Sequence, residues 1–419
     1  MAKSRHQIPF FDDGKLCNIK TPVEIKFKEK KMINVAHPVI GKKERQLIKE
    51  VLDSRILASG KYVTQFEQSF AKYSGAKFGI ASVNGTTSLH TALLMCGVKS
   101  GDKVITTPFS FIATANSILF CNAKPIFADI DPKTFNINPV ELEKILRKEK
   151  NAKAVLVVHL YGLPCDMDTI LELKQKYKFK LIEDSCQAHG AEFKNKKVGS
   201  FGDASAFSFY ATKNMMTGEG GIILTNDAKF DKYARQVINH GRDGHSTHTV
   251  LGYNYRLTNL AAAIGIAQLE QLENWIAKRI TNAQEYNEAF KDLDFLQIPC
   301  VPKNSRHVFH QYTIRVSPSQ REEFIKYLAG KGIESGIYYN SVIYNQPFYK
   351  QLGYEVGLCK EAEKVAQEVV SLPVHQSLSK ADIYKIIKVI KSYKNEYKNS
   401  RDRGRIFRTA PCKNFRTAL

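Results

Sequence analysis

The sequence predicts an α/β fold in which helices cover a mostly parallel central sheet, with a smaller α+β unit towards the C-terminus. Between residues 78 and 225, short apolar runs alternate with segments of helical periodicity, as in chains of βαβ units. The run Ala154–Val158 is apolar throughout, which is typical of a strand buried on both faces of a sheet. Beyond residue 295 this alternation ends.

The individual elements are predicted from the period of their apolar residues. Strands of the central sheet are expected at residues 78–83, 103–106, 125–128, 154–158, 180–182, 204–209 and 221–225. Helices are expected directly after Gly85 and at residues 111–120, 140–148, 167–177 and 257–278. In the smaller unit, strands are expected at 312–316 and 336–339, and helices at 321–331, 361–370 and 380–398.

The domain organisation follows from changes in composition along the chain. Prolines and polar residues cluster at 295–305, which separates a large domain (34–295) from a small C-terminal domain (296–399). Residues 1–33 lack a clear period and are interpreted as an N-terminal arm. Residues 400–419 hold five arginines in a chain that otherwise prefers lysine, and this basic tail is expected to be disordered.

The bulk composition is that of a soluble globular enzyme, with 43% hydrophobic and 25% charged residues in a chain of 419. No stretch is apolar enough for a membrane span, and the N-terminus lacks the apolar core of a signal peptide. A cytoplasmic protein is therefore expected. The eight cysteines show no CxxC and no metal-ligand spacing, so reduced thiols and no metal site are predicted.

The net charge of +21 raises the possibility of nucleic-acid binding. The basic residues are spread along the whole chain, however, and no nucleic-acid-binding motif is present. A solvated lysine-rich surface is therefore predicted instead of a specific nucleic-acid site. Such a positive field would also favour an anionic substrate.

Two residues point to covalent chemistry. Lys213 follows small and hydroxylated residues and precedes a glycine-rich run at 217–221, which suits an imine to the aldehyde of pyridoxal phosphate (PLP). Asp184 ends an apolar strand, where a charge is costly unless it is paired, and the protonated ring nitrogen of PLP would be such a partner. The alternatives are a surface lysine and a helix-capping or salt-bridged aspartate.

A phosphate site is predicted where the first strand of the sheet gives way to a helix. Gly85, Thr86 and Thr87 stand at that helix N-terminus. The free backbone N–H groups, the helix dipole and two hydroxyls would together bind an anion.

Five segments in this order resemble the DegT/DnrJ/StrS family of PLP-dependent sugar aminotransferases, over about residues 34–395. They are Asn84–Leu89, Thr107–Thr114, Val158–Gly162, Glu183–Gly190 and Ser208–Gly221. The resemblance implies the fold-type-I architecture of aspartate aminotransferase. The family's Glu-Asp-Ala-Ala-Gln appears here as Glu183-Asp184-Ser185-Cys186-Gln187, a change between small residues.

The resemblance implies roles for individual residues. Lys213 would hold PLP and carry protons, and Asp184 would bind its ring nitrogen. Gln187 would contact the phenolic oxygen of PLP, with ordinary loop hydrogen bonding as the alternative. Ser208 would add a hydroxyl to the phosphate site, unless it is a strand residue with no such task. Asn254 would reach the phosphate from the neighbouring subunit, which implies a homodimer with shared active sites; its alternative is a turn asparagine.

The remaining implied contacts are an aromatic residue and four pocket residues. Phe111 would stack on the PLP ring, with Phe109 as a nearby competitor. His159 and His189 would lie near the cofactor or substrate, although each has the alternative of a buried, satisfied histidine. The substrate pocket would receive Tyr338 and His375 from the small domain.

The predicted function is transfer of an amino group from L-glutamate to a nucleotide-linked keto sugar, with a 4-keto sugar favoured over a 3-keto sugar, in amino-sugar or surface-polysaccharide biosynthesis. One alternative is a PLP-dependent sugar dehydratase. Relatives that dehydrate sugars carry histidine at the position of Lys213. This chain has lysine there, which favours amino transfer over dehydration. A second alternative is a non-catalytic protein that uses the fold for sensing or for binding a partner.

Overall fold

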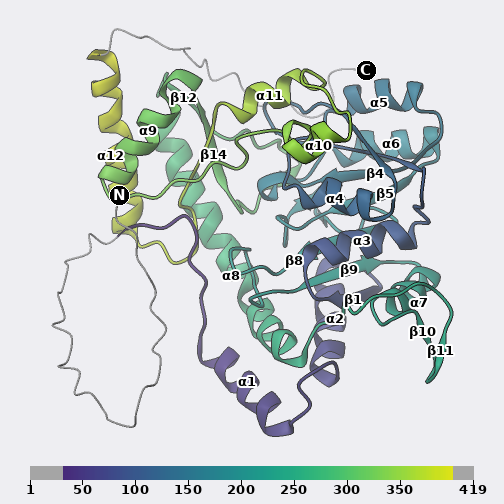
Figure 1. The fold of residues 1–419 in the computed structure, drawn as a ribbon. Helices are drawn as coiled ribbons and strands as arrows, with labels where there is room; N and C mark the ends of the chain where they lie inside the picture. Colours follow the sequence, from purple (N-terminus) through teal and green to yellow (C-terminus); the bar gives the residue numbers. More distant parts are fainter. Residues whose placement is uncertain (1–31, 400–419) are drawn as a thin grey trace, which may run out of the picture. The chain divides into compact units, whose positions relative to one another are not determined.

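A seven-stranded sheet forms the centre of the fold in a computed structural model that describes residues 32–399 (Figure 1). The basic tail and nearly all of the predicted N-terminal arm lie outside the described residues. The sheet order is β1 (Phe78–Ser82), β9 (Gly221–Thr225), β8 (Ala204–Ser208), β5 (Lys180–Asp184), β4 (Ala152–Val158), β2 (Lys103–Thr106) and β3 (Lys124–Phe127). Only β9 runs antiparallel to its neighbours, so the predicted mostly parallel sheet is confirmed.

Helices cover both faces of this sheet because apolar side chains of the strands point alternately to each face. The helices of this part are α1 (Lys42–Ser54), α2 (Lys61–Ser74), α3 (Gly85–Met95), α4 (Ala113–Phe120), α5 (Pro139–Lys148), α6 (Met167–Tyr177), α7 (Ala228–Val237) and α8 (Asn259–Phe290). Phe66 of α2 and Ile266 of α8 share one core with Ile222 of the sheet. Leu93 of α3 shares another core with Ile223.

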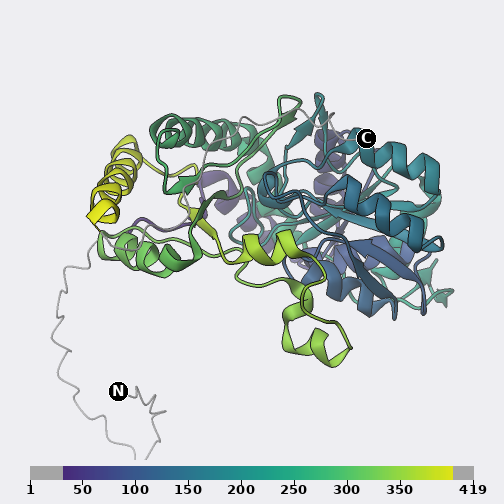
Figure 2. The same ribbon diagram turned by 90° about the horizontal axis from the view of Figure 1, so that it is seen from above.

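A second, three-stranded antiparallel sheet lies in the C-terminal part of the chain. Its strands are β12 (Leu296–Gln297), β14 (Tyr312–Val316) and β15 (Val369–Leu372), and the helices of this part are α9 (Pro318–Gly330), α10 (Pro347–Gln351), α11 (Lys360–Ala366) and α12 (Lys380–Asn399). The yellow helix α12 lies beside α9 (Figures 1 and 2), and both contribute to one core around Tyr312. The predicted domain boundary near residue 295 stays a prediction, because α8 supplies side chains to this core and to that of the large sheet.

Short elements complete the described fold. They are the strands β6 (Glu192–Phe193), β7 (Lys196–Lys197), β10 (Arg242–Asp243), β11 (Thr247–His248) and β13 (Ser305–Arg306), and the 3-10 turns at Leu160–Gly162 and Ile343–Asn345. No helix between residues 32 and 399 has the length and apolar character needed to cross a membrane. Within the same residues, no group of three or more His, Cys, Asp or Glu side chains could hold a metal ion.

Some predicted elements are wrong in detail. Residues 336–339 form no strand: Gly336 pairs once with Ser371, and the chain then leaves the sheet. The helix predicted at 361–370 ends at Ala366, because the β-branched residues Val369 and Val370 enter β15. Helices α1, α2, α7 and α10 were not predicted.

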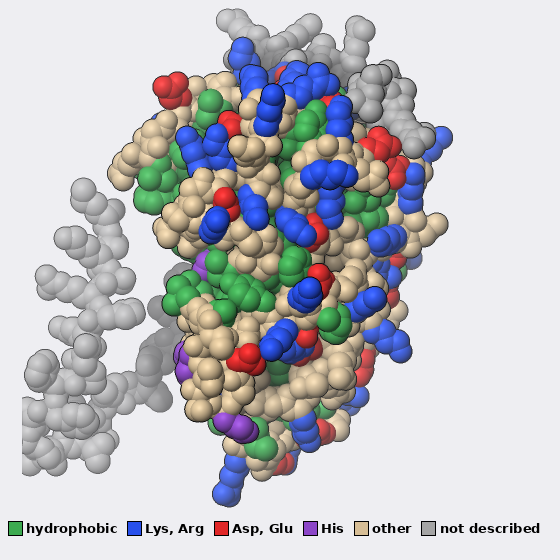
Figure 3. All heavy atoms as spheres, turned by 90° about the vertical axis from the view of Figure 1, so that its right-hand side faces the viewer, with side chains coloured by type: hydrophobic (Ala, Val, Ile, Leu, Met, Phe, Trp, Pro, Cys, Tyr) green, Lys and Arg blue, Asp and Glu red, His purple; other side chains and the backbone are tan. Residues whose placement is uncertain are grey.

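The structure can also be compared with two expectations from composition, the state of the cysteines and the distribution of basic side chains. Among residues 32–399, the free cysteines are Cys96, Cys121, Cys165, Cys186 and Cys359, whereas Cys300 is disulfide-bonded, contrary to the expectation of reduced thiols. Basic side chains are spread over the face drawn in Figure 3, with acidic ones between them. This distribution agrees with a solvated lysine-rich surface.

Candidate active site

A cavity of about 470 Å³ opens where the parallel strands β4, β5 and β8 end. The strand register brings these ends together, since Val158 pairs with Asp184 and Asp184 with Ala206. This is the edge of an α/β sheet where ligands commonly bind. The predicted site residues that line the cavity are Gly85, Thr86, Phe111, Asp184, Gln187, Ser208, Lys213 and Tyr338.

Lys213 lies in the loop that follows β8, and its backbone N–H donates to the carbonyl of Tyr210 over 2.9 Å. Desolvation lowers the pKa of the Lys213 ammonium, although the nearby Cys186 and Asp184 oppose this shift. A lower pKa leaves a larger fraction of the amine neutral and therefore nucleophilic. The position and the lowered pKa both suit a lysine that attacks an aldehyde.

Asp184 is held in the cavity wall by donors from two directions. The Thr114 hydroxyl donates to Oδ2 over 2.8 Å, and the backbone N–H of Cys186 donates to Oδ1 over 3.2 Å. The Ser110 and Thr114 hydroxyls are 2.9 Å apart, so Ser110 extends this network. A carboxylate that is 5% exposed and ordered in this way fits a cationic partner such as a pyridinium.

The N-terminus of α3, where the phosphate site was predicted, packs closely against the end of β8. A Cβ on Gly85 would lie 2.7 Å from Ser208 Cβ and 3.0 Å from Cys186 Sγ, so glycine is required there for the close approach of β8. The Asn84 side chain caps the helix by accepting the Thr87 N–H over 2.9 Å. The Thr87 hydroxyl donates to the Asn84 carbonyl, and Thr87 does not line the cavity.

Gln187 and Phe111 occupy the part of the cavity that faces the 336–342 segment. Gln187 Oε1 accepts the Tyr161 N–H over 2.8 Å, and Nε2 donates to the Tyr339 hydroxyl over 3.1 Å. The Phe111 ring is 56% exposed and 6.2 Å from the Tyr339 ring. Phe109 is fully buried in a core instead, so the structure separates the two candidates for the stacking aromatic.

His159 is not brought to the cavity but is buried against Glu183. Its Nδ1 accepts the Cys165 N–H over 3.1 Å, so Nε2 carries the hydrogen that is donated to Glu183 over 3.0 Å. Burial opposes the charge on Glu183, but hydrogen bonds from His159 and from the N–H groups of Gly199 and Gly202 outweigh it and lower the pKa of Glu183. His159 therefore has the contacts of a buried, satisfied histidine.

His189, His375 and Asn254 also do not line the cavity. His189 packs among Phe70, Phe207 and Phe209, and burial lowers its pKa to about 3, with Lys213 adding to the shift. His375 Nε2 lies 3.1 Å from the Asn34 carbonyl, and burial lowers its pKa to about 4. Asn254 is exposed, as a residue offered to a neighbouring subunit would be.

Several lining residues were missed by sequence reasoning. They include Ser110, Thr114, Cys186, Glu219, His310, Gln311 and Tyr339. Thr114 and Cys186 lie inside the motifs quoted above, so sequence reasoning found these motifs but did not predict that both residues donate hydrogen bonds to Asp184. His310 and Gln311 precede β14 and could not have been placed at the cavity without the fold.

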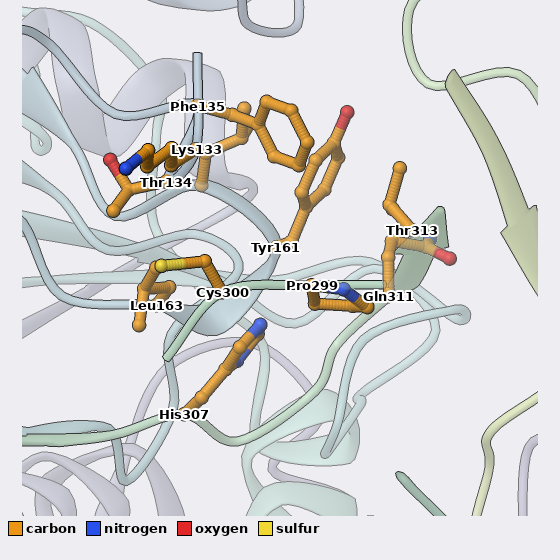
Figure 4. A pocket seen from close by; sticks show the side chains of 11 residues that line it. Lys133, Thr134, Phe135, Tyr161, Leu163, Pro299, Cys300, His307, Gln311 and Thr313 are labelled. Carbon is orange, nitrogen blue, oxygen red and sulfur yellow. The ribbon is translucent and has the colours of Figure 1, made fainter. Parts of the chain in front are cut away.

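A second pocket lies beside Tyr161 and Gln311, with Cys300 and His307 in its wall (Figure 4). Its volume is about 10 Å³, which is no more than the space of a single water molecule. It is therefore no second ligand site.

The fold and the cavity define the aminotransferase class, because a lysine, a strand-end carboxylate and a helix N-terminus converge at the carboxyl edge of the sheet. Residues 38–391 match the DegT/DnrJ/EryC1/StrS aminotransferase family, and the chain belongs to this family. This confirms the resemblance and the predicted fold class.

Relatives and solved structures agree with this assignment. The chain is 38% identical to GDP-perosamine synthase of Caulobacter vibrioides over 362 residues, 85% of this chain and 96% of the relative. It is 35% identical to UDP-2-acetamido-2-deoxy-3-oxo-D-glucuronate aminotransferase of Pseudomonas aeruginosa over 351 residues, 82% of this chain and 96% of the relative. The crystal structure of S. venezuelae DesV in complex with a ketimine intermediate has a TM-score of 0.81 at 28% identity, covering 86% of this chain and 95% of that one.

Proposed function

We propose that this protein is a PLP-dependent aminotransferase that moves an amino group from an amino acid, L-glutamate, to a nucleotide-linked keto sugar. The observation that carries the proposal is the convergence of Lys213, Asp184 and Gly85 on one cavity. The residues fit PLP: a desolvated amine for the aldehyde, an ordered carboxylate for the ring nitrogen, and a close-packed helix N-terminus for the phosphate.

PLP, when bound, supplies an electron sink and a temporary carrier for the amine. The protein's own residues do the remaining work. Lys213 would hold the cofactor and, once released, carry a proton at Nζ between substrate and cofactor. Asp184 would keep the ring nitrogen protonated, and Thr114 would keep Asp184 oriented. Gly85, Thr86 and Ser208 would bind the phosphate, and Phe111 would stack on the ring.

A nucleotide-linked sugar is supported by the names of the relatives, which include GDP-perosamine synthase and an aminotransferase acting on a UDP-linked 3-oxo sugar. We propose a 4-keto sugar as the preferred acceptor, on the basis of the family resemblance. A role in polysaccharide biosynthesis is supported by 36% identity, over 371 residues, to the Bacillus subtilis spore coat polysaccharide biosynthesis protein SpsC. We also propose that the enzyme acts in the cytoplasm.

A homodimer with shared active sites is supported by the charges in the cavity. Among the described residues that line it, Lys213 is the lone lysine or arginine, whereas Asp184 and Glu219 are both acidic. The carboxylate of the amino donor and the diphosphate of the acceptor need further cationic or polar donors. A second subunit could supply them, together with Asn254, which is exposed in this chain.

The test is to incubate PLP-loaded protein with L-glutamate and a panel of GDP-, UDP- and dTDP-linked 3-keto and 4-keto sugars, and to analyse the products by mass spectrometry. Replacement of the keto oxygen by an amine is the expected result. Loss of water from the sugar without gain of nitrogen would establish the dehydratase instead. A protein that binds PLP but releases no 2-oxoglutarate would be the non-catalytic alternative.

A further inference from the structure

We propose that Tyr339 is a positioning residue that fixes the Gln187 amide through its hydroxyl and supports Phe111 through its ring. The proposal rests on the proposed function, because Gln187 and Phe111 are the residues expected to contact the phenolic oxygen and the ring of PLP. Tyr339 lines the same cavity as both. These three residues come from distant parts of the chain, so the tertiary structure alone brings them together.

The orientation of the Gln187 amide is fixed by its neighbours. The Tyr161 backbone N–H can only donate, so the atom 2.8 Å away must be the amide oxygen of Gln187. The amide nitrogen then donates one hydrogen to the Tyr339 hydroxyl over 3.1 Å. Its second hydrogen is left for the cavity, where a donor suits the anionic phenolic oxygen of the cofactor.

The Tyr339 hydroxyl stays protonated at neutral pH. The ordinary pKa of a tyrosine is already about 10. Burial raises the pKa of Tyr339 further, and the Asp184 carboxylate adds to the rise against the opposing hydrogen bond from Gln187. Tyr339 can therefore accept the Gln187 hydrogen while its own O–H remains a donor. Without this hydroxyl, the Gln187 N–H group would lose its partner, and the hydrogen bond from the Tyr161 N–H alone would hold the amide.

The Tyr339 ring links an anchored phenylalanine to an exposed one. It meets the fully buried Phe109 edge-on, with ring centroids 6.3 Å apart, and the exposed Phe111 at 6.2 Å. Such aromatic pairs are favourable at these separations. The position of the Phe111 ring is therefore supported from the core through Tyr339.

The segment that carries Tyr339 is fastened on both sides, although it forms no strand. Before it, Gly336 and Ser371 exchange two backbone hydrogen bonds of 3.0 and 2.7 Å. The Tyr161 hydroxyl donates to the Tyr338 carbonyl, and after the segment the Ile343 N–H donates to Pro108 over 2.9 Å. The Tyr339 side chain is thus held in place before any ligand enters, as a positioning residue requires.

The experiment measures PLP binding, with the absorbance spectrum of the lysine-bound cofactor as a second readout. Tyr339→Phe keeps the ring and removes the hydroxyl, so the Kd for PLP should rise about five-fold, the loss of one hydrogen bond, and the absorbance maximum should shift. Tyr339→Leu removes the ring as well and should raise the Kd further. Tyr354→Phe is the matched control, because its hydroxyl donates to Pro125 over 2.7 Å outside the cavity.

A double variant separates action through Gln187 from a general effect on the fold. If Tyr339 acts through Gln187, Tyr339→Phe should add nothing to the higher Kd of Gln187→Ala. A Tyr339→Phe protein with wild-type Kd and spectrum would overturn the proposal, as would fully additive effects in the double variant. Wild-type protein that binds no PLP would instead overturn the proposed function, and the role of Tyr339 with it.

Discussion

Thr114 in the first turn of α4 donates a hydrogen bond of 2.8 Å to Asp184 at the end of β5. This contact joins a helix and a strand that are 70 residues apart in the chain. It orients the carboxylate while leaving it in the cavity wall. Lys213, in the loop after β8, and Gly85, at the N-terminus of α3, line the same cavity.

Substitutions of Asp184 and Thr114 should distinguish the effect of the Asp184 charge on kcat from the effect of its orientation by Thr114. Asp184→Asn should lower kcat by about 10²- to 10³-fold, the size of effect seen when one electrostatic stabiliser is removed. Thr114→Val removes only the supporting hydroxyl, so it should lower kcat less and cost about 1–3 kcal/mol of stability. Steady-state kinetics and urea unfolding measure the two effects. Equal losses of kcat in both variants would contradict this division.

Lys213→Ala and Lys213→Arg should both abolish the absorbance of the lysine-bound cofactor and turnover, because neither side chain can form the covalent bond to the aldehyde. The measurement is a visible spectrum of PLP-loaded protein followed by an assay with L-glutamate. Lys391→Ala, an exposed lysine of α12, serves as the control and should keep both signals. Full transamination by either Lys213 variant would refute the assignment.

Gly85→Ala should weaken PLP binding, because the new methyl group would lie 2.7 Å from Ser208 Cβ and push the predicted phosphate site apart. The expected loss of stability is about 1–3 kcal/mol, as for other overpacked sites. Gly330→Ala is the matched control, since an added Cβ at this helical position meets no atom of residues 32–399 within 4 Å. It should leave PLP affinity unchanged. Equal PLP affinities of the two variants would show that the predicted phosphate site tolerates a side chain.

Glu183→Gln should destabilise the fold by about 3–5 kcal/mol, because a buried carboxylate with matched donors is replaced by a group that brings two hydrogens. Those donors are Gly199 at 2.7 Å, Phe201 at 2.8 Å, Gly202 at 2.7 Å and His159 at 3.0 Å. Folding lowers the pKa of Glu183. The carboxylate therefore contributes fully to the free energy of unfolding above about pH 4.3, its pKa in the unfolded state, and this contribution is lost as the pH falls towards its pKa in the folded state. Unfolding at pH 7 and pH 3.5 should therefore show a smaller difference between variant and wild type at the lower pH.

His189→Leu should gain stability relative to wild type as the pH falls. The folded pKa of His189 is about 3, because of burial and then of Lys213, with Arg279 a further cation nearby. The unfolded state therefore binds the proton first, and the stability contributed by neutral His189 declines from about pH 6.5 downwards. Between pH 7.5 and pH 5, the free energy of unfolding of the variant should rise by about 2 kcal/mol relative to that of the wild type.

Urea unfolding at these two pH values measures the change. The exposed His245 provides the control. In a His245→Leu variant, the difference in free energy of unfolding from the wild type should be the same at both pH values. A His189→Leu protein whose stability relative to wild type is the same at both pH values would contradict the lowered pKa.

The sequence by itself determined the sheet and the main chemistry. The period of apolar residues predicted strands such as 103–106 and 221–225 with the bounds that the structure has. This worked because a strand buried in the sheet requires a short apolar run, which can be recognised in the local sequence. The motifs predicted one site for Lys213, Asp184 and Gly85, since Asp184 ends a strand of the sheet, Lys213 lies in the loop after another, and Gly85 begins a helix that follows a third. Family membership followed from the same motifs.

The tertiary structure decided which neighbours complete the site. His159 and His189 lie in the motifs, yet their side chains point into the core, because chain position does not fix the direction of a side chain in a loop. Tyr339 and His310 line the cavity from a part of the chain with no local signal for it. Contacts such as Gln187 with Tyr339 join residues 152 positions apart, and only the tertiary fold brings them within hydrogen-bonding distance.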